Sequence, residues 1–374
     1  MGDRCGWAML LRMRRAEIQR GVGLALLFLL LAAAVFAGAR LLRYVHGYAG
    51  SRFRPESLAE AAPTCFYLDW RTRWSDGEEL RRALGEDGVV RSIRDRTRDG
   101  GVRHNPLRVI QIALALHDLQ LESPTPDRER IFRRQLDWIT GDGMLRLPGG
   151  HLVWPHYDAF ERYGLSGVWI SALTQGQAIS LLVRAARYTG EARYLELAHQ
   201  AAAALRDREF GMRWEGPHGS CFYEEFPCDP PAHALNGCLL AWLGLWDLAR
   251  ASSSEAAREA CLRDLDCFEP IVRQHARGDW TRYDLHQQRP TSPAYHELHA
   301  ALAEALAAIT GQPRWEARAR DWRRSAEDAF ARLRVAARVV RGKIETLLRP
   351  QSARPRGRTL GAGWRAEAPR GGVR

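Results

Sequence analysis

The chain has 374 residues, 46% of them hydrophobic, which is enough for one large packed domain or two small ones. Its net charge of +11 would suit a nucleic-acid-binding protein if the basic residues clustered on a folded face. The excess lies at the chain ends instead: residues 1–20 carry +3, residues 349–374 carry +6, and the residues between them carry only +2. The charge distribution therefore argues against a nucleic-acid-binding domain.

A stretch of nineteen residues without a charged side chain, 21–39, follows the basic segment 1–20. At about 1.5 Å per residue a helix over it nearly spans the hydrocarbon core, and it exceeds the apolar region of about 7–15 residues in a cleaved signal peptide. More arginines precede the stretch than follow it, which keeps the N-terminus in the cytoplasm. We expect a transmembrane signal anchor at 21–43 and an extracytoplasmic domain at the cell membrane. The small residues Ala37-Gly38-Ala39 leave a cleaved signal as the alternative.

Six cysteines follow this segment, and an even number in an oxidising compartment permits disulfides. Cys221 with Cys228 and Cys261 with Cys267 are candidate pairs because they would close short loops, although the sequence does not determine the pairing. No CxxC motif or Cys/His spacing typical of a zinc site occurs, so no metal site is expected.

Residues 44–100 are polar and weakly periodic, which predicts a juxtamembrane linker. From Pro106 onward apolar residues follow a helical period, and further helices are predicted at about 127–140, 171–189, 191–207, 232–250, 255–277, 293–310 and 313–348. Long loops are expected at 141–168 and 209–231. The Arg-, Gly- and Pro-rich tail 349–374 is predicted to be disordered.

Thr189-Gly190 and Thr310-Gly311 each separate two predicted helices, and an aromatic residue follows each glycine by four positions. Glycine tolerates the left-handed conformation that ends a helix. Repeated helical hairpins of this kind predict an all-α fold, an (α/α) toroid or incomplete barrel over residues 101–348. A generic helical bundle is the alternative.

The residues between the predicted helices are the ones suited to chemistry. Trp169, Ser171, Gln175 and Gln177 cluster where a helix begins, and an aromatic ring beside amides suits the apolar face and polar edge of a sugar. N-capping by Ser171 and core packing by Trp169 explain part of the same pattern without a ligand.

A second segment places two adjacent carboxylates, Glu224 and Glu225, between aromatic residues, with Tyr223 before them and Asn236 shortly after. Apolar surroundings raise the pKa of a carboxylate and make it a competent general base. The aromatic neighbours distinguish this segment from an ordinary solvated loop.

A third segment holds Tyr283, His286, Arg289, Tyr295 and His296. An arginine there could pair with a substrate carboxylate, and the tyrosines could transfer protons if a nearby cation lowered their pKa toward neutrality. The spacing is not HExxH, which disfavours a zinc hydrolase. A loop leading into an ordinary surface helix is the simpler interpretation.

Taken together, the segments WISALTQGQAISLLVRA, YEEFP, LNG, YDLH and SPAYHELH resemble, in order and spacing, the C-terminal domain of the D-glucuronyl C5-epimerases. The resemblance covers about residues 104–325. It implies a helical toroid-like catalytic domain, no redox cofactor, and conversion of D-glucuronosyl to L-iduronosyl units within a polysaccharide. Position by position it implies Glu225, Tyr283 and Tyr295 as catalytic residues, and Asn236 with the stretch 289–298 as substrate contacts.

Two positions depart from this family pattern. Phe226 stands where the animal enzymes have a tyrosine, and His286 stands where they have an arginine. The first removes a hydroxyl from the expected site and the second weakens the expected hold on a carboxylate. The large β-domain of the animal members has no room within residues 44–100.

Epimerisation at C5 removes a proton next to the uronate carboxylate and returns one to the opposite face, so it needs two proton carriers. Our hypothesis assigns Glu225 to one face and Tyr295 to the other, with Tyr283, His286 and Arg289 neutralising the carboxylate. A uronate lyase and an inactive glycan-binding or assembly protein are the alternatives. The expected partners are a uronate-containing polysaccharide and the membrane, and a homodimer is one candidate assembly.

Overall fold

The computed structural model describes residues 51–59, 64–75, 77–91, 104–278, 280–288, 290–348 and 355–360, the side chains of 339–348 excepted. Contacts divide the chain into two units, Met1–Tyr48 and Ala49–Arg374, and all described residues belong to the second. None of the helices in these ranges is long and apolar enough to span a membrane. The predicted anchor at 21–43 lies outside the described residues.

The described chain is mostly helical, as predicted. Its α-helices are α2 (Arg71–Trp74), α3 (Gly77–Ala83), α4 (Pro106–Glu122), α5 (Pro126–Thr140), α6 (Ala172–Thr189), α7 (Arg193–Arg206), α8 (Leu235–Ala251), α9 (Glu255–His275), α10 (Pro293–Thr310), α11 (Pro313–Glu327) and α12 (Ala329–Leu348). Short strands pair in antiparallel twos: β1 (Leu145–Arg146) with β2 (Leu152–Val153), β3 (Arg213–Glu215) with β4 (Cys221–Tyr223), β5 (Cys228–Asp229) with β8 (Arg356–Gly357), and β6 (Ala276–Arg277) with β7 (Trp280–Thr281).

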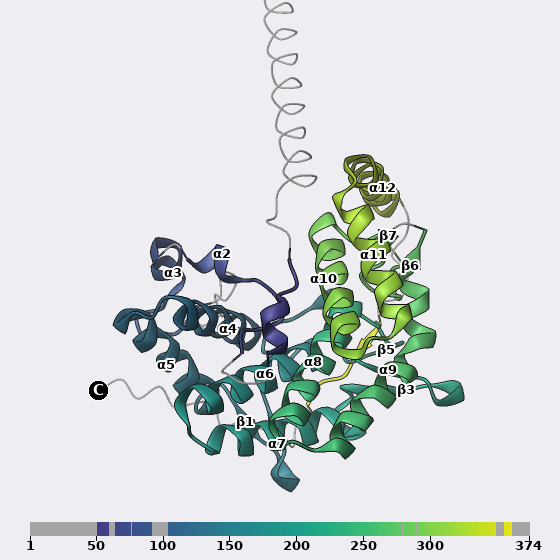
Figure 1. Ribbon diagram of the computed structural model, residues 1–374. Coiled ribbons are helices and arrows are strands. Elements are labelled where there is room, and N and C mark those ends of the chain that lie inside the picture. The colour runs from purple at the N-terminus through teal and green to yellow at the C-terminus, as the bar shows by residue number, and fades with distance from the viewer. Residues whose placement is uncertain are drawn as a thin grey trace, which may run out of the picture. The chain divides into compact units, whose positions relative to one another are not determined.

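Helices α4 to α11 form four consecutive hairpins, which are visible in Figure 1. The first helix of each hairpin contacts the first helix of the next, so that α4, α6, α8 and α10 form an inner row. Helices α6 and α8 are buried along most of their length, whereas α5, α7, α9 and α11 bury one stripe each. A helix that is apolar all round belongs in the interior, and an amphipathic one covers it.

Local sequence signals explain where these helices begin and end. Ser254 and Ser292 each accept a hydrogen bond from a backbone N–H in the first turn of the helix that follows, which is the usual N-cap. Gly190 and Gly311 end α6 and α10 in the left-handed conformation, with φ of 76° and 62°. The repeated Thr-Gly signal therefore marks two helix ends, as predicted.

Helices α6 and α8 cross without side chains between their backbones. A Cβ at Gly244 would lie 2.0 Å from the carbonyl oxygen of Gly176, and a Cβ at Gly176 would lie 2.3 Å from Cα of Ala241. Both contacts are with backbone atoms, which cannot move aside as a flexible side chain can. Glycine at both positions sets the spacing of the two central helices.

Two element predictions were wrong in detail. The helix predicted at 313–348 is two helices, since Asp328 adopts an extended backbone with ψ of 113° and its carboxylate accepts a hydrogen bond from the N–H of Phe330. The predicted loops 141–168 and 209–231 contain the hairpins β1–β2 and β3–β4.

The prediction of a linker over 44–100 is wrong for the described residues 51–91, which belong to the helical domain. Arg54 forms a 2.6 Å ion pair with Asp118 of α4, and the Tyr67 hydroxyl donates to Asp247 of α8 at 2.7 Å. The buried Arg184 of α6 also pairs with Asp247 at 2.6 Å. The apolar residues of 51–91 come in short runs rather than with a helical period, which is why their burial was not recognised.

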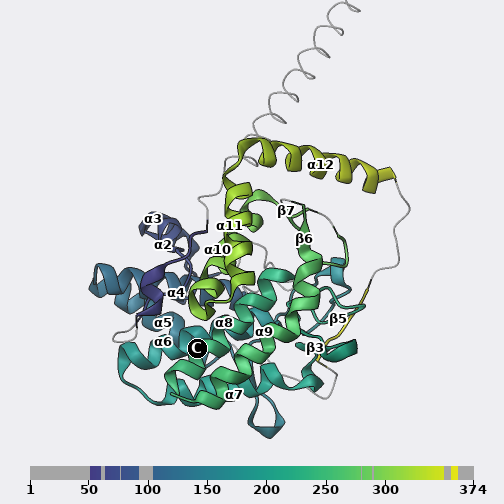
Figure 2. The same cartoon turned by 45° about the vertical axis from the view of Figure 1, so that its right-hand side comes forward.

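The prediction of disorder for the tail is wrong for residues 355–360. Cys228 of β5 pairs with Gly357 of β8, and the N–H of Arg358 donates to the carbonyl of Pro227 at 2.7 Å. The N–H of Leu360 donates to the carbonyl of Val168 at 2.8 Å. Figure 2 shows this yellow segment beside β5.

Neither candidate disulfide is present. Cys221 of β4 is joined to Cys267 of α9 across 46 residues, while Cys228 and Cys261 are buried free thiols. Short loop length was therefore a misleading criterion, because the folded chain brings β4 against α9.

The Gly244→Ala substitution tests the close crossing of α6 and α8. The added methyl group must displace backbone, so we expect a loss of about 1–3 kcal/mol or more in the free energy of unfolding. Chemical denaturation followed by circular dichroism measures it. Gly77→Ala is the control, because its Cβ would meet only the guanidinium end of Arg81 at 3.4 Å, and its effect should stay within about 0.5 kcal/mol. Equal effects of the two substitutions would contradict this account.

Candidate functional site

The two central helices begin at the candidate site. The first N–H of α6, at Ala172, donates to the carbonyl of Glu224, and the first N–H of α8, at Leu235, donates to the carbonyl of Tyr283, both at 3.1 Å. Neither helix has a side-chain N-cap, since Ser171 and Ala234 provide none. Backbone N–H groups at a helix start need partners, so capping fixes the segments that carry Glu224 and Tyr283.

Glu225 is the centre of the site and is only 7% exposed. One carboxylate oxygen accepts a hydrogen bond from the Tyr283 hydroxyl at 3.1 Å, and the other accepts one from the side-chain amide of Asn236 at 3.2 Å. A Cβ at Gly237 would lie 2.4 Å from Cβ of Glu225, so glycine is needed there to admit the carboxylate. Burial raises the pKa of Glu225 to about 8, although the two hydrogen bonds oppose that rise.

Two tyrosines adjoin this carboxylate. Tyr283 and Tyr295 pack edge to face with ring centroids 4.8 Å apart, and Tyr295 is 42% exposed in the first turn of α10. Glu225, Asn236, Tyr283 and Tyr295 thus lie together, although 70 residues of sequence separate the first from the last.

The condition set for proton transfer by these tyrosines, a pKa lowered by a nearby cation, is not met among the described residues. Burial, followed by the nearby carboxylate of Glu225, raises the pKa of Tyr283 well above its usual value and that of Tyr295 to about 12. The positive charge of Arg162 acts in the opposite direction on the pKa of Tyr295 and is outweighed. Both phenols therefore stay protonated at neutral pH.

Sequence reasoning missed Tyr163 and Asp284. The Tyr163 hydroxyl donates to Asp284 at 2.7 Å, and the other oxygen of Asp284 accepts from the N–H of Gln287 at 2.6 Å. The Tyr163 ring also stacks on Phe226, with centroids 4.1 Å apart and an interplanar angle of 12°. Nothing in the sequence linked Tyr163, within a predicted loop, to a carboxylate 121 residues away. The pair holds the loop that follows Tyr283.

Glu224 does not join the cluster. It is 2% exposed, and its two oxygens interact with the backbone N–H of His233 at 2.9 Å and with Nδ1 of the same histidine at 2.5 Å. It lines a separate cavity of about 270 Å³. Its predicted role as a contact beside Glu225 is therefore not supported by this placement.

Three other predicted contacts have structural roles instead. All are buried and hydrogen-bonded inside the protein: Gln175 to the carbonyls of Leu152 and Ala201, Tyr223 to Asp264, and His296 to Thr281 and Ser325. Their polar atoms connect neighbouring elements, and their role as substrate contacts stays a prediction. The sequence showed polar residues at helix starts but not which way they face.

The other predicted contacts divide into three groups. Trp169 stacks on His156 at 4.3 Å, and its indole donates to the carbonyl of Asp158, so it packs within the protein. Ser171 and Gln177 are also buried, and neither amide atom of Gln177 has a hydrogen-bond partner among the described residues. His286 is half-buried in the loop after Tyr283. Arg289 lies outside the described residues.

The cluster combines a carboxyl group that exchanges its proton near neutral pH with phenols that keep theirs. Glu225 can act as a base once ionised, and the exposed Tyr295 can act as an acid. Burial raises the pKa of both groups, to about 8 for Glu225 and about 12 for Tyr295, so the site holds a base and an acid at the same pH. The arrangement suits proton abstraction and return without a covalent intermediate.

The raised pKa of Glu225 predicts a pH-dependent stability effect for Glu225→Gln. The pKa is about 4.5 when unfolded and about 8 when folded, so ionisation destabilises the native wild-type protein as pH rises through this interval. The variant should therefore gain stability relative to wild type by a few kcal/mol more at pH 9 than at pH 5, as measured by urea unfolding. Glu196→Gln, on the exposed face of α7, should show no such difference. A pH-independent effect of Glu225→Gln would contradict the raised pKa.

Comparison with known sequences shows which proteins this domain is similar to. Residues 149–324 match the family described as "D-glucuronyl C5-epimerase C-terminus". A D-glucuronyl C5-epimerase of Caenorhabditis elegans is 32% identical over 161 residues, which cover 38% of this chain and 26% of that protein. An uncharacterized protein of Methanocaldococcus jannaschii is 28% identical over 153 residues, covering 40% of this chain and 49% of its own length. The chain thus spans no more than about half of these relatives.

Two solved structures share part of the helical arrangement. A family 76 glycoside hydrolase (mannosidase) of Bacteroides thetaiotaomicron has a TM-score of 0.39 at 10% identity, covering 58% of this chain and 56% of that one. Cellobiose 2-epimerase from Spirochaeta thermophila has a TM-score of 0.44 at 13% identity, covering 64% of this chain and 71% of that one. Such low TM-scores carry no functional inference.

Proposed function

Because residues 149–324 match the family described as "D-glucuronyl C5-epimerase C-terminus", we propose that this chain is an isomerase that epimerises uronate units of a polysaccharide at C5. The proposed reaction converts D-glucuronosyl to L-iduronosyl units. One observation carries the proposal: Glu225, whose pKa is raised to about 8, accepts a hydrogen bond from Tyr283. Tyr283 in turn packs against Tyr295.

In the proposed reaction the carboxylate of Glu225 takes the C5 proton of a glucuronate unit. The electron pair of the broken C–H bond is delocalised onto the substrate carboxylate, which becomes an enediolate. The Tyr295 hydroxyl then gives its proton to the opposite face of C5, and solvent restores both side chains. No electron leaves or enters the substrate, so the reaction needs no oxidant or reductant. General acid–base catalysis of this kind contributes about 10²–10⁴-fold to a rate.

The enediolate requires hydrogen-bond donors or cations at the substrate carboxylate. Tyr283 stays protonated, and its O–H can turn from Glu225 to the substrate carboxylate once Glu225 has taken the C5 proton, so we assign it this role. The positive charge of Arg162 acts on Tyr295, so Arg162 is a further candidate for stabilising the substrate carboxylate, one that the sequence did not suggest. Arg289 and His286 remain candidates from the family resemblance.

For the arrangement of the domain, we propose that the four hairpins α4 to α11 are an (α/α) toroid or incomplete barrel whose inner helices start at the site. We also retain the membrane anchor at 21–43, with the domain on the extracytoplasmic side, as a proposal from the arginine asymmetry. Its partner there would be a uronate polymer.

Solvent exchange tests the reaction. When the full-length protein is incubated with an unsulfated glucuronate polymer in D₂O, deuterium should appear at C5 together with iduronate, both measured by NMR. Glu225→Gln and Tyr295→Phe should each lower the exchange rate at least about 100-fold, because each removes one proton carrier. Glu196→Gln and Tyr194→Phe, both in the outer helix α7, should leave it unchanged.

Other outcomes would identify the alternatives. An unsaturated product absorbing in the ultraviolet would show a lyase, in which the C4 substituent leaves after the same proton abstraction. Binding of the polymer without exchange at C5 would show a glycan-binding protein and would overturn the proposed activity.

The pKa of Glu225 also predicts the pH profile of exchange. Because the base must be ionised, kcat/KM should rise from pH 6, reach half its maximum near pH 8 and level off at higher pH. Tyr283→Phe removes a hydrogen bond that lowers the pKa of Glu225, so the midpoint should move to higher pH in addition to any loss of rate. An unchanged or lower midpoint would contradict the assigned contact.

A further inference from the structure

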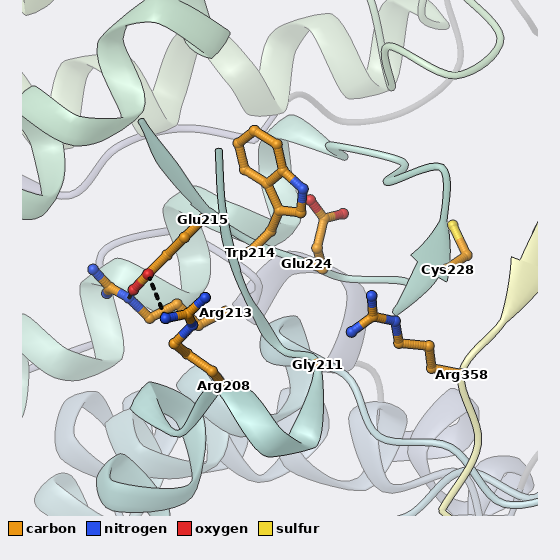
Figure 3. Close-up of a pocket in the computed structure, with 8 residues that line it drawn as sticks. All are labelled: Arg208, Gly211, Arg213, Trp214, Glu215, Glu224, Cys228 and Arg358. Atoms are coloured by element: carbon orange, nitrogen blue, oxygen red, sulfur yellow. Dashed lines mark hydrogen bonds and ion pairs between the residues drawn. The ribbon is translucent and has the colours of Figure 1, made fainter. Parts of the chain in front are cut away.

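A cavity of about 270 Å³ adjoins the candidate site without sharing its residues. Glu224 lines this cavity, whereas the next residue, Glu225, joins the tyrosine cluster. Three arginines and a tryptophan, Arg208, Arg213, Arg358 and Trp214, also line it. Figure 3 shows Arg208 and Arg213 on one side, Arg358 on the other, and Trp214 and Glu224 between them.

Two of the three guanidinium groups are already paired. Arg208 and Arg213 both interact with Glu215, at 3.1 and 3.2 Å, and Arg213 also pairs with Asp264 at 3.1 Å. These ion pairs fix one wall of the cavity. They leave little positive charge on that side for a ligand.

Arg358 differs because no carboxylate of the described chain pairs with it. Its backbone is fixed by the hydrogen bond to the carbonyl of Pro227, and the stem of its side chain passes Gly211, where a Cβ would lie 3.3 Å from Cδ. Gly211 has a φ of 70°, which glycine adopts without strain. The guanidinium therefore extends from an anchored segment with its donors available, and Figure 3 shows it pointing into the cavity on the side of Glu224.

The other charged groups that line the cavity have partners within the protein. The carboxylate of Glu224 is occupied by the N–H and ring nitrogen of His233. Trp214 packs edge-on against the same histidine with centroids 4.6 Å apart, and it is only half-buried. A half-buried indole and an unpaired guanidinium in the same cavity fit a sugar ring that bears a carboxylate.

We propose that this cavity is a second binding site for a uronate unit, in which Arg358 pairs with the sugar carboxylate and Trp214 contacts the ring. It would hold another unit of the polymer that reacts at Glu225, so the identity of its ligand rests on the proposed function. Arg358 lies beyond the family match at 149–324, so the resemblance does not supply this site. The tail thereby has a role in binding rather than in catalysis.

Binding measurements with Arg358→Gln in the full-length chain test the site. The dissociation constant for the unsulfated glucuronate polymer should rise about tenfold, as expected for loss of a charge-assisted pair. Arg356→Gln is the matched control, because Arg356 is an exposed arginine two residues earlier that does not line the cavity, and it should change affinity less than about twofold. With a carboxyl-reduced, neutral form of the polymer, wild type and Arg358→Gln should bind equally.

Equal losses for the two variants would reduce the effect to general attraction by a basic tail and would overturn the proposal. So would an unchanged affinity of Arg358→Gln, or an Arg358-dependent affinity for inorganic phosphate without one for the polymer. C5 exchange measured in parallel separates the two proposals. If the wild type exchanges the C5 hydrogen but Arg358→Gln does not change affinity, only the second site is rejected. If binding depends on Arg358 but no exchange occurs, only the epimerase activity is rejected.

Discussion

The first turn of α8 is the constraint on which the site depends. Its first N–H binds the carbonyl of Tyr283, its Asn236 donates to Glu225, and its Gly237 leaves the space that the Glu225 side chain fills. One turn of helix thus fixes both the carboxylate and the phenol that contacts it. The position of α8 is itself fixed by its close crossing with α6, where Gly244 lies against the backbone of Gly176. Precise placement of reactive groups on rigid elements is what proton transfer between faces of a sugar requires.

Burial decides the protonation states in this cluster. A carboxylate near the first turn of a helix is ordinarily stabilised, by up to about 2 kcal/mol, and the hydrogen bonds from Tyr283 and Asn236 act in the same direction. Desolvation outweighs the hydrogen bonds, since the pKa of Glu225 rises to about 8. The same burial raises the pKa of the phenols, with the carboxylate adding to it. Burial therefore brings the pKa of the base close to neutral pH and keeps the phenols protonated.

Sequence patterns that are local predicted the fold well, and patterns that depend on distant contacts did not. Helix starts at Ser254 and Ser292 and helix ends at Gly190 and Gly311 are encoded within a few residues. The aromatic surroundings of Glu225 likewise predicted its burial. By contrast, the Tyr163–Asp284 contact, the Cys221–Cys267 disulfide and the anchoring of residues 51–91 all join distant segments. Whether Gln175 or Tyr223 faces a ligand or the core is also decided by such packing.

The departure at Phe226 can be understood from what surrounds it. A ring without a hydroxyl adds no polar group beside Glu225, and it stacks on Tyr163, whose own hydroxyl points to Asp284. Asp284 also binds the N–H of Gln287, so it fixes the loop directly after Tyr283. A hydroxyl at position 226 would need a partner in this buried cluster, where an unpaired polar group costs about 1–3 kcal/mol. Phenylalanine here is therefore consistent with a site that places its hydroxyl groups at Tyr163, Tyr283 and Tyr295 and leaves Glu225 in apolar surroundings.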